Sequence, residues 1–540
     1  MIKSCFIPSV QKLWGLILFC TALNLGGTED LFAVDSKSPI DGGTLIFGRG
    51  GDSVNLDPAA VTDGESLNVT DNIFDNLVTT KSGTTDIIPA LATKWDISAD
   101  GLTYTFYLRK DAKFHDGTDV NADAVIFSFM RQKDPAHKAY KFSGPYVYFK
   151  ALGLDKLIKG ITKTDDYTVK FQLTRPEAPF LSCLSMQSFA IVSPTAVMKY
   201  QKKFGRNPVG SGPFVFKKWE KNQKIVLARN SKYWEGAPHL KTLIFRSIPD
   251  NSTRLIEMMA QKIHVMDNPN PDDISTLKEK LGGKVNFAKQ AGFNVGYLAM
   301  NNDKKPFNNV LVRKAIAHAI NKEGIIKAVY AGYAEVAKNP MPPTLWGHND
   351  AVPGYEYNPK KAKELLKKAG YPEGFTTTLW AMPVPRPYMP DGRKVAEAIQ
   401  GDLAKIGVKV KIVSYEWGTY LDKTEQGEHD MALMGWTGDI GDPDNFLYVL
   451  LDKDNTVKPA QNISFYKSQK LHDVLIAAKA ESNQDKRIEL YEKAQSIIYN
   501  DVPMVPLAHS ITVVPTLKRV QNFQLDPTGR RRFSKVWLAK

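Results

Sequence analysis

The chain has 540 residues, of which 43% are hydrophobic and 10% aromatic, so it can bury more than one sizeable core. This composition excludes disordered and fibrous proteins. The formal net charge is +14, but the basic residues are spread along the whole chain. Only Arg530, Arg531 and Arg532 form a run, so we interpret the basic excess as solvated surface rather than as a nucleic-acid site.

The first 33 residues are typical of a secretory signal peptide. Lys3 and Lys12 precede the apolar stretch LWGLILFCTALNL, which is too short to span a bilayer. Cys5 and Cys20 would be removed with this segment, which leaves Cys183 and excludes an internal disulfide. Since Cys183 lies in the apolar context PFLSCLSM, we interpret it as a buried, unreactive thiol.

The region up to about residue 290 mixes strands and helices without an internal repeat. Strands are predicted in GGTLIFGRGG, YTFYLRKDAKFHDG and YTVKFQLTRPEAPF. NADAVIFSFMRQK is predicted to be a helix that begins near Asn121 or Asp123. GSGPFVFKKWEKNQKIVLARN is predicted to be a hairpin with its turn at Asn222.

From about residue 290 the pattern changes. NVGYLAMN is typical of a buried strand, and VRKAIAHAINKEGIIKAVY of a helix pair. In NPKKAKELLKKAGYP, Asn358 is a predicted helix cap and Pro359 lies in the first turn. We interpret His318 as a packed core residue, and His115 and His429 as solvated residues of polar turns.

The most informative pattern is strand–helix–strand–helix–strand. Strands are predicted at 375–383 and 408–415 and in MALMGW, separated by the helices GRKVAEAIQGDLAKIGV and WGTYLDKTEQG. The first of these helices has an apolar face formed by Val395, Ala398, Ile399, Leu403 and Ile406. This order predicts three parallel strands with right-handed crossovers.

Open α/β sheets bind ligands at the carboxyl ends of their strands. Arg386 and Tyr388 follow the first strand, Trp417 follows the second, and Gly438 and Asp439 follow the third, with Trp436 at its end. Asp439 suits an ammonium group and Arg386 a carboxylate, so together they suit a zwitterion. The aromatic residues could enclose it and exclude water. The structural alternative is that Asp439 caps a turn and Arg386 pairs with a surface acid.

Enzyme and metal sites have weaker support. The chain lacks G-x-x-x-x-G-K-[ST], H-E-x-x-H, C-x-x-C and G-x-S-x-G. Asp439, Asp442 and Asp444 could form a metal loop, but Pro443 interrupts the run and the later glutamate of a calcium loop is absent. We therefore expect a binding protein without a catalytic site, metal or cofactor.

WAMPVPRPYMP, YEWGTYL, GEHDMALMGWTGDIGDPDNF and NVGYLAMN resemble the periplasmic dipeptide-binding proteins of bacterial ABC importers, within extracellular solute-binding protein family 5. The resemblance implies a two-lobed α/β periplasmic-binding-protein fold, type II-like, with an extra α+β subdomain. Lobe I would comprise 39–290 and 511–540, with the subdomain at about 72–205, and lobe II would comprise 291–510. The chain would cross between the lobes near 292–301 and 506–510.

The resemblance also implies roles for single residues. Asp439 would bind the α-ammonium group of a dipeptide and Arg386 its α-carboxylate, with Trp436 and Tyr388 lining the cavity. The expected partners are a dipeptide and the permease subunits of an ABC transporter, without nucleic acid, and the expected form is a periplasmic monomer. The chain departs from known dipeptide binders at GRGGDSVNLDP and after DPDNF, where their paired cysteines are missing. Open alternatives are an oligopeptide, haem or metal-chelate binder and a secreted peptide hydrolase.

Overall fold

Three larger β-sheets and the helices around them make up residues 39–540, which are the residues that the computed structural model describes. The predicted signal peptide, with Cys5 and Cys20, lies outside the described residues. Among the described helices, none combines the length and apolar character needed to cross a bilayer. Cys183 is buried, and burial raises the pKa of its thiol well above the usual value, as expected for an unreactive core residue.

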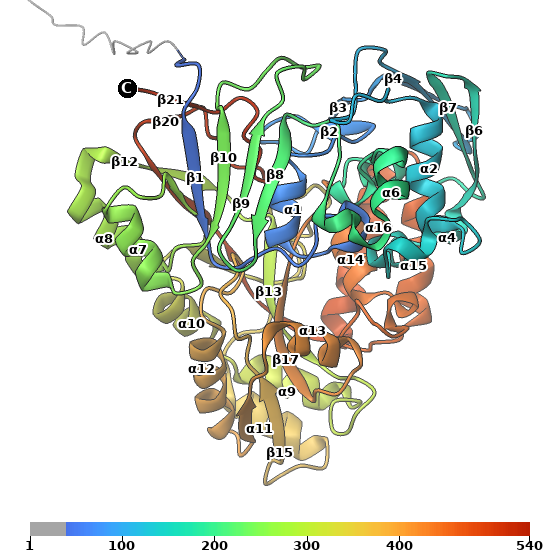
Figure 1. Cartoon of the computed structure of the whole chain (residues 1–540). Coiled ribbons are helices and arrows are strands. Elements are labelled where there is room, and N and C mark those ends of the chain that lie inside the picture. Colours follow the sequence, from blue (N-terminus) through green and yellow to red (C-terminus); the bar gives the residue numbers. More distant parts are fainter. Residues whose placement is uncertain (1–38) are drawn as a thin grey trace, which may run out of the picture. The chain divides into compact units, whose positions relative to one another are not determined.

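A seven-stranded sheet is formed mostly by the first half of the chain (Figure 1). In spatial order its strands are β12 (Val285–Gln290), β19 (Thr512–Leu517), β11 (Val265–Met266), β1 (Thr44–Arg49), β10 (Thr242–Ser247), β9 (Lys224–Arg229) and β8 (Phe214–Glu220). β1 is parallel to β10 and β11, and the other pairs are antiparallel. The predicted hairpin is β8–β9, and its turn residue Asn222 has a φ of 60°, which asparagine tolerates well.

Three helices accompany this sheet: α1 (Gly64–Thr70), α7 (Asn251–Met259) and α8 (Pro271–Leu281). Two short strand pairs complete this part of the chain: β2 (Val78–Thr80) with β3 (Ile87–Pro89), and β20 (Val520–Gln521) with β21 (Trp537–Leu538). Asp63 caps α1, since its carboxylate accepts a hydrogen bond of 2.9 Å from the backbone N–H of Ser66. The cap fixes the start of a helix that will border the site.

A four-stranded antiparallel sheet lies within the predicted extra subdomain. In spatial order its strands are β4 (Ala92–Ile97), β5 (Thr103–Leu108), β7 (Thr168–Leu173) and β6 (Ile158–Asp165). The predicted helix is α2 (Ala122–Lys133), capped by Asn121, and it packs Phe129 edge-on against Phe171 of β7. The short helices here are α3 (Val147–Ala151), α4 (Leu154–Leu157), α5 (Phe180–Cys183) and α6 (Pro194–Tyr200).

A six-stranded sheet contains the predicted strand–helix–strand pattern. In spatial order its strands are β14 (Ala334–Val336), β18 (Met504–Ser510), β13 (Asn294–Met300), β17 (Met431–Thr437), β15 (Thr376–Trp380) and β16 (Lys409–Val413). β15 runs parallel to both β16 and β17, which confirms the three parallel strands. β13 is buried along its whole length because it pairs with β17 on one side and β18 on the other.

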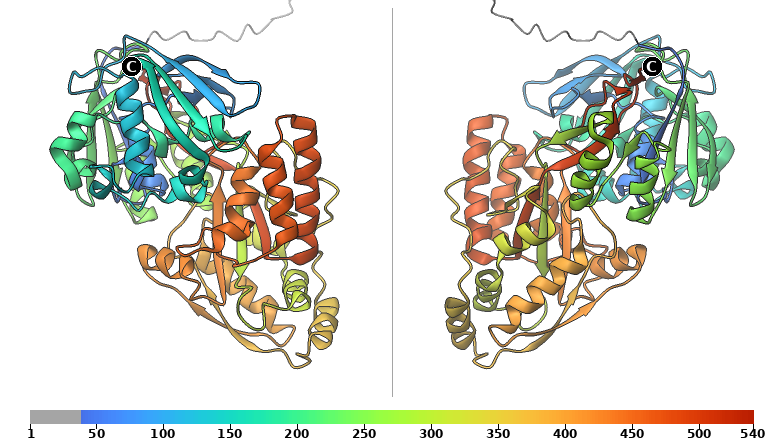
Figure 2. Two further views of the ribbon diagram at one scale, coloured as in Figure 1. Left: turned by 90° about the vertical axis from the view of Figure 1, so that its right-hand side faces the viewer. Right: turned by 90° about the vertical axis from the view of Figure 1, so that its left-hand side faces the viewer.

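Eight helices surround this sheet, and some of them were predicted from the sequence. They are α9 (Val310–Ala319), α10 (Lys322–Val329), α11 (Pro359–Lys368), α12 (Gly392–Ala404), α13 (Trp417–Glu425), α14 (Asp444–Leu451), α15 (Gln469–Ala480) and α16 (Gln484–Asp501). Asn358 caps α11 as predicted, and Val395, Ile399 and Leu403 form the buried face of α12. In both views of Figure 2, α15 and α16 (red-orange) stand side by side.

The chain passes twice between the seven-stranded and the six-stranded sheet, at adjacent places. β12 leads into β13, and β18 leads back into β19 after a single residue, Ile511. The side chain of Asn294 joins the two passages, since its Oδ1 accepts from the backbone N–H of Ser510 (2.9 Å) and its Nδ2 donates to the Ser510 carbonyl (3.2 Å). The lobe boundaries at 290 and 511 remain predictions.

The predictions for two histidines were wrong. His429 is fully buried, its Nε2 lies 2.9 Å from the Ile463 carbonyl, and its ring packs against Trp380. His115 is half-buried, with Nε2 2.9 Å from the Gly212 carbonyl. Burial lowers the pKa of each imidazole to about 4. Their polar sequence neighbours concealed this, because distant strands and loops cover the two rings. His318 is buried, as predicted.

Candidate functional site

A cavity of about 270 Å³ is lined by segments next to the seven-stranded sheet and by segments of the six-stranded sheet and its connections. Residues 62–71, which include α1, line it together with the C-terminal segment 527–531. β17, α13 and the loop after β15 provide lining residues from the six-stranded sheet and its connections. The carboxyl ends of parallel strands thus border the cavity, as the topology predicts.

Five of the six predicted site residues line this cavity: Asp439, Arg386, Trp436, Tyr388 and Trp417. Gly438 does not line it, which corrects its prediction as a contact residue. Its backbone N–H donates to the Phe293 carbonyl (2.8 Å), and a Cβ atom would lie 2.5 Å from the Phe293 ring. Gly438 is therefore a packing residue that allows the turn after β17 to pass close to aromatic side chains.

Asp439 is held at the end of β17 by Asn445. The Oδ1 atom of Asn445 accepts from the backbone N–H of Asp439 (2.8 Å) and from Nε1 of Trp436 (3.0 Å). Tyr148 donates its hydroxyl to Asp439 Oδ1 at 3.3 Å, whereas Oδ2 is buried without a hydrogen-bond partner among residues 39–540. Burial raises the pKa of this carboxyl to about 7. The turn thus presents a half-buried carboxyl group whose buried Oδ2 atom lacks a partner.

The other two aspartates of this turn have structural roles. Asp442 forms an ion pair with Arg487 of α16 at 2.8 Å, and Asp444 lies 3.6 Å from Lys479 of α15. These contacts attach α15 and α16 to the start of α14. Because Asp442 and Asp444 are matched by cationic side chains, the geometry does not favour the alternative of a metal loop formed with Asp439.

A second acidic group contains Asp452, Asp454 and His472, whose potential ligand atoms all lie within 4.8 Å of one another. His472 Nδ1 lies 3.0 Å from both carboxylate oxygens of the fully buried Asp452. Asp452 also accepts from the backbone N–H of Asp454 (2.8 Å). These direct contacts account for the cluster without a metal ion.

Arg386 projects from a tight turn after β15. Its backbone N–H donates to the Met389 carbonyl (3.0 Å), and the Met389 N–H donates back (2.9 Å). The guanidinium lies over the ring of Trp417, 4.9 Å from the centroid, and its Nη1 is 3.9 Å from Oε1 of Glu65. The alternative of a surface acid as partner is wrong, because Glu65 is buried and lines the same cavity.

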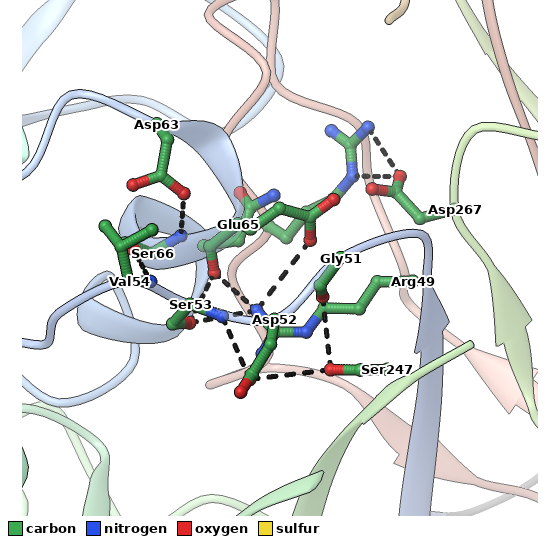
Figure 3. Close-up of polar contacts among 12 residues, drawn as sticks. Arg49, Gly51, Asp52, Ser53, Val54, Asp63, Glu65, Ser66, Ser247 and Asp267 are labelled. Carbon is green, nitrogen blue, oxygen red and sulfur yellow. Dashed lines mark hydrogen bonds and ion pairs between the residues drawn. The ribbon is translucent and has the colours of Figure 1, made fainter. Parts of the chain in front are cut away.

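Glu65 was missed in the sequence, although it belongs to the site. It lies in the first turn of α1, and its Oε2 is 3.8 Å from Nη1 of the fully buried Arg49. Figure 3 shows Glu65, Arg49, Asp52 and Ser53 turned toward one another. Burial raises the pKa of Glu65 to about 7 despite Arg49 and Arg386. Only the tertiary contact with the loop after β15 identifies it as a site residue.

Tyr388 is fixed by two facing glycines. Gly296 of β13 pairs with Gly435 of β17, and Tyr388 packs on both. A Cβ atom at Gly435 would lie 2.1 Å from Cδ2 of Tyr388, and one at Gly296 would lie 2.4 Å from its carbonyl oxygen. The hydroxyl of Tyr330 donates to the same carbonyl (2.8 Å). The glycine pair therefore makes room for an aromatic residue at the cavity wall.

The arginine run near the C-terminus is not solvated surface, which corrects that prediction. Arg530 pairs with Asp71 and Arg531 with Asp267, and both arginines line the cavity. Arg532 donates to the Thr80 carbonyl at 2.8 Å. Each of these guanidinium groups is matched by acceptors from segments far away in the sequence, so composition alone could not reveal their burial.

The chain belongs to the bacterial extracellular solute-binding proteins, family 5, whose sequence model matches residues 86–458. The dipeptide-binding protein of Escherichia coli K12 is 42% identical over 94% of this chain and 96% of its own. Haem-binding protein A of Haemophilus influenzae is 40% identical over 91% of each chain. An ABC transporter-associated periplasmic binding protein of Helicobacter pylori, solved with the peptide STSA, is 46% identical, with a TM-score of 0.87 over 93% of this chain and 99% of its own.

Proposed function

We propose that this protein is a periplasmic receptor that captures dipeptides and delivers them to the permease of an ABC transporter. One observation carries the proposal: a half-buried carboxyl group, that of Asp439, and a guanidinium, that of Arg386, line the same cavity. A dipeptide carries the complementary groups at its two ends. The relatives solved or named with peptides support this ligand class.

In the proposed complex, Asp439 accepts hydrogen bonds from the α-ammonium group and Arg386 donates to the α-carboxylate. An extended chain advances at most about 3.3–3.6 Å per residue, so the gap between the two side chains limits the number of residues accepted. Trp436, Tyr388 and Trp417 exclude water, which strengthens both charged contacts. Termini are common to all dipeptides, so this mechanism tolerates many side chains.

Delivery would follow from closure of two lobes, 39–290 with 511–540 and 291–510, about the adjacent passages at Asn294 and Ser510. Because ligand contacts from both lobes stabilise the closed form, binding shifts the population toward it. The permease would then recognise the closed receptor. In this proposal the mature protein is a monomer that binds its ligand without chemical change.

Native mass spectrometry of the purified protein distinguishes the ligand classes. Bound masses that correspond to a range of dipeptides are expected. Longer peptides, haem or a metal chelate as the bound mass would contradict the dipeptide assignment while leaving the solute-binding family unchanged. Release of free amino acids from added dipeptides would instead identify a hydrolase.

Calorimetry with Gly-Leu and its C-terminal amide tests the role of Arg386. The native chain should bind Gly-Leu more than tenfold tighter than the amide, because only the acid offers a carboxylate to the partly buried guanidinium. Arg386→Ala should bind Gly-Leu more than tenfold more weakly and should no longer prefer the acid. Arg393→Ala is the matched control, since Arg393 lies on the exposed surface of α12 beside Glu397.

The N-terminal contact has a parallel test. Asp439→Asn should weaken Gly-Leu binding by more than tenfold, because the α-ammonium group then lacks a buried counter-charge. If Arg386→Ala keeps its preference for the acid, or Asp439→Asn keeps native affinity, the two proposed end contacts are wrong.

A further inference from the structure

The cavity walls carry more acidic than basic side chains. Three arginines line the cavity, and each has an acidic partner within 4 Å: Arg386 with Glu65, Arg530 with Asp71 and Arg531 with Asp267. Three further acids line the cavity without an ion pair among the described residues: Asp63, Asp439 and Glu425. A zwitterionic ligand adds no net charge, so it leaves this acidic excess in place.

Two of the three unmatched acids already have a role. Asp63 caps α1 through the N–H of Ser66. Asp439 faces the α-ammonium group in the proposed complex. Glu425 has no such role, and within residues 39–540 its carboxylate takes part in no hydrogen bond or ion pair that meets ordinary distance criteria.

The position of Glu425 offers no structural benefit. It is the last residue of α13, where the helix dipole disfavours a negative charge. Asp422, three residues earlier, adds like-charge repulsion, and burial together with Asp422 raises the pKa of Glu425 to about 7. A half-buried acid in an unfavourable place on a cavity wall is typical of a group retained for a ligand.

The surroundings of Glu425 fit a long side chain that ends in a cation. The cavity lining also includes Leu421, one turn before Glu425 on α13, and apolar side chains from β17, α14 and the segment before α15: Met434, Leu450 and Ile463. The backbone N–H of Ala460 donates to the Glu425 carbonyl (3.0 Å) and so ties this segment to the end of α13. Lysine and arginine place an aliphatic stem on apolar surface and a charged group at its end.

We propose that Glu425 and these four apolar residues, here called the Glu425 pocket, bind a lysine or arginine side chain of the ligand. Dipeptides with one basic residue are then preferred over neutral and acidic ones. This assignment rests on the proposed function and narrows its substrate class. It also offsets the acidic excess of the cavity, because the ligand then contributes a net positive charge.

Four dipeptides test the pocket by calorimetry: Lys-Ala, Ala-Lys and their counterparts with norleucine, which keeps the aliphatic stem and lacks the ammonium group. At least one lysyl peptide should bind the native chain at least tenfold tighter than its norleucine counterpart. In Glu425→Gln this ratio should fall to about one. Glu428→Gln should keep the native ratio, since Glu428 pairs with Lys423 on the exposed surface and does not line the cavity.

The outcomes separate this proposal from the one on which it rests. Equal binding of lysyl and norleucyl peptides by the native chain would overturn the Glu425 pocket and leave dipeptide capture intact. A lysine preference that persists in Glu425→Gln but disappears in Glu65→Gln would also overturn it, because the cation would then sit at the Arg386 end. Failure of all four peptides to bind would overturn dipeptide capture itself.

Discussion

Asp439 illustrates at the scale of one residue how a binding group costs stability. Its folded-state pKa is about 7 because of burial, whereas its ordinary value is 3.8. Between these values the folded state binds more protons than the unfolded state, so the free energy of unfolding falls as pH rises from about 4 to 7. Above pH 7 the carboxyl is ionised in both states, so its effect on the free energy of unfolding no longer changes with pH. A ligand ammonium group would offset this cost, which suits a carboxylate kept for binding.

Replacement of Asp439 by asparagine should therefore stabilise the ligand-free protein at pH 8. The gain has an upper bound of about 4 kcal/mol, from roughly three pKa units, and should shrink toward zero near pH 4. Urea denaturation of ligand-free native and Asp439→Asn protein at pH 4, 6 and 8 measures it. An equal difference at all three pH values would show that the carboxyl does not titrate as its burial requires.

Individual site residues were predictable only where a local rule applied. Asp439 and Arg386 follow strands of a recognisable parallel pattern. Because open α/β sheets bind ligands at the carboxyl ends of their strands, this pattern located both residues. Glu65 and Arg530 reach the cavity from near the two ends of the chain, through contacts with Arg49, Arg386 and Asp71. No local sequence pattern encodes such contacts.

At the scale of elements, the glycine pair of β13 and β17 determines where Tyr388 lies. Gly435→Ala should destabilise the protein by about 1–3 kcal/mol, because the added methyl group overlaps the Tyr388 ring. It should also weaken Gly-Leu binding, since the ring would be displaced at the cavity wall. Urea denaturation and calorimetry measure the two effects.

Gly401→Ala is the matched control for that substitution. Gly401 lies within α12, and a Cβ atom there would have no neighbour within 4 Å. Alanine should stabilise this helix by about 0.5–1 kcal/mol and leave peptide affinity unchanged. If both alanine variants lose the same stability, steric overlap with Tyr388 is not the cause.

Elements with strong periodicity or clear caps were predictable. Which strands pair with one another in a sheet was less predictable. The apolar face of α12 and the caps of α2 and α11 identify helices from local chemistry alone. The position of β13 between β17 and β18 depends instead on pairing across more than 130 and 200 residues, as for Leu298 with Leu433 and Val505. Long-range pairing of this kind leaves no periodic signal in the sequence.

At the scale of the whole molecule, one buried lysine connects distant parts of the chain. Lys479 of α15 lies 3.0 Å from Glu177, which precedes α5, and 3.6 Å from Asp444 of α14. All three side chains are buried, and the Lys479 carbonyl accepts from the backbone N–H of Ala178 (2.8 Å). The two carboxylates hold the pKa of Lys479 well above its usual value. This contact attaches the predicted extra subdomain to the helices of the six-stranded part.

Lys479→Met should therefore lower the free energy of unfolding by about 3–5 kcal/mol, because it leaves two buried carboxylates without their cation. Lys486→Met on α16 is the control, since its contact with Glu481 is solvent-exposed, and it should cause no measurable change. Guanidinium denaturation compares the variants. Equal stability of Lys479→Met and the native chain would show that the buried ion pairs contribute nothing net.

The place of β19 in the seven-stranded sheet has a consequence for the order of folding. β19 lies between β12 and β11, although it is made more than 220 residues after β12. The six-stranded sheet needs only residues 294–510 and is complete once β18 has emerged. A chain that appears amino-terminus first therefore completes its later sheet before its earlier one, in which the edges of β11 and β12 stay unpaired while the residues up to β19 are made.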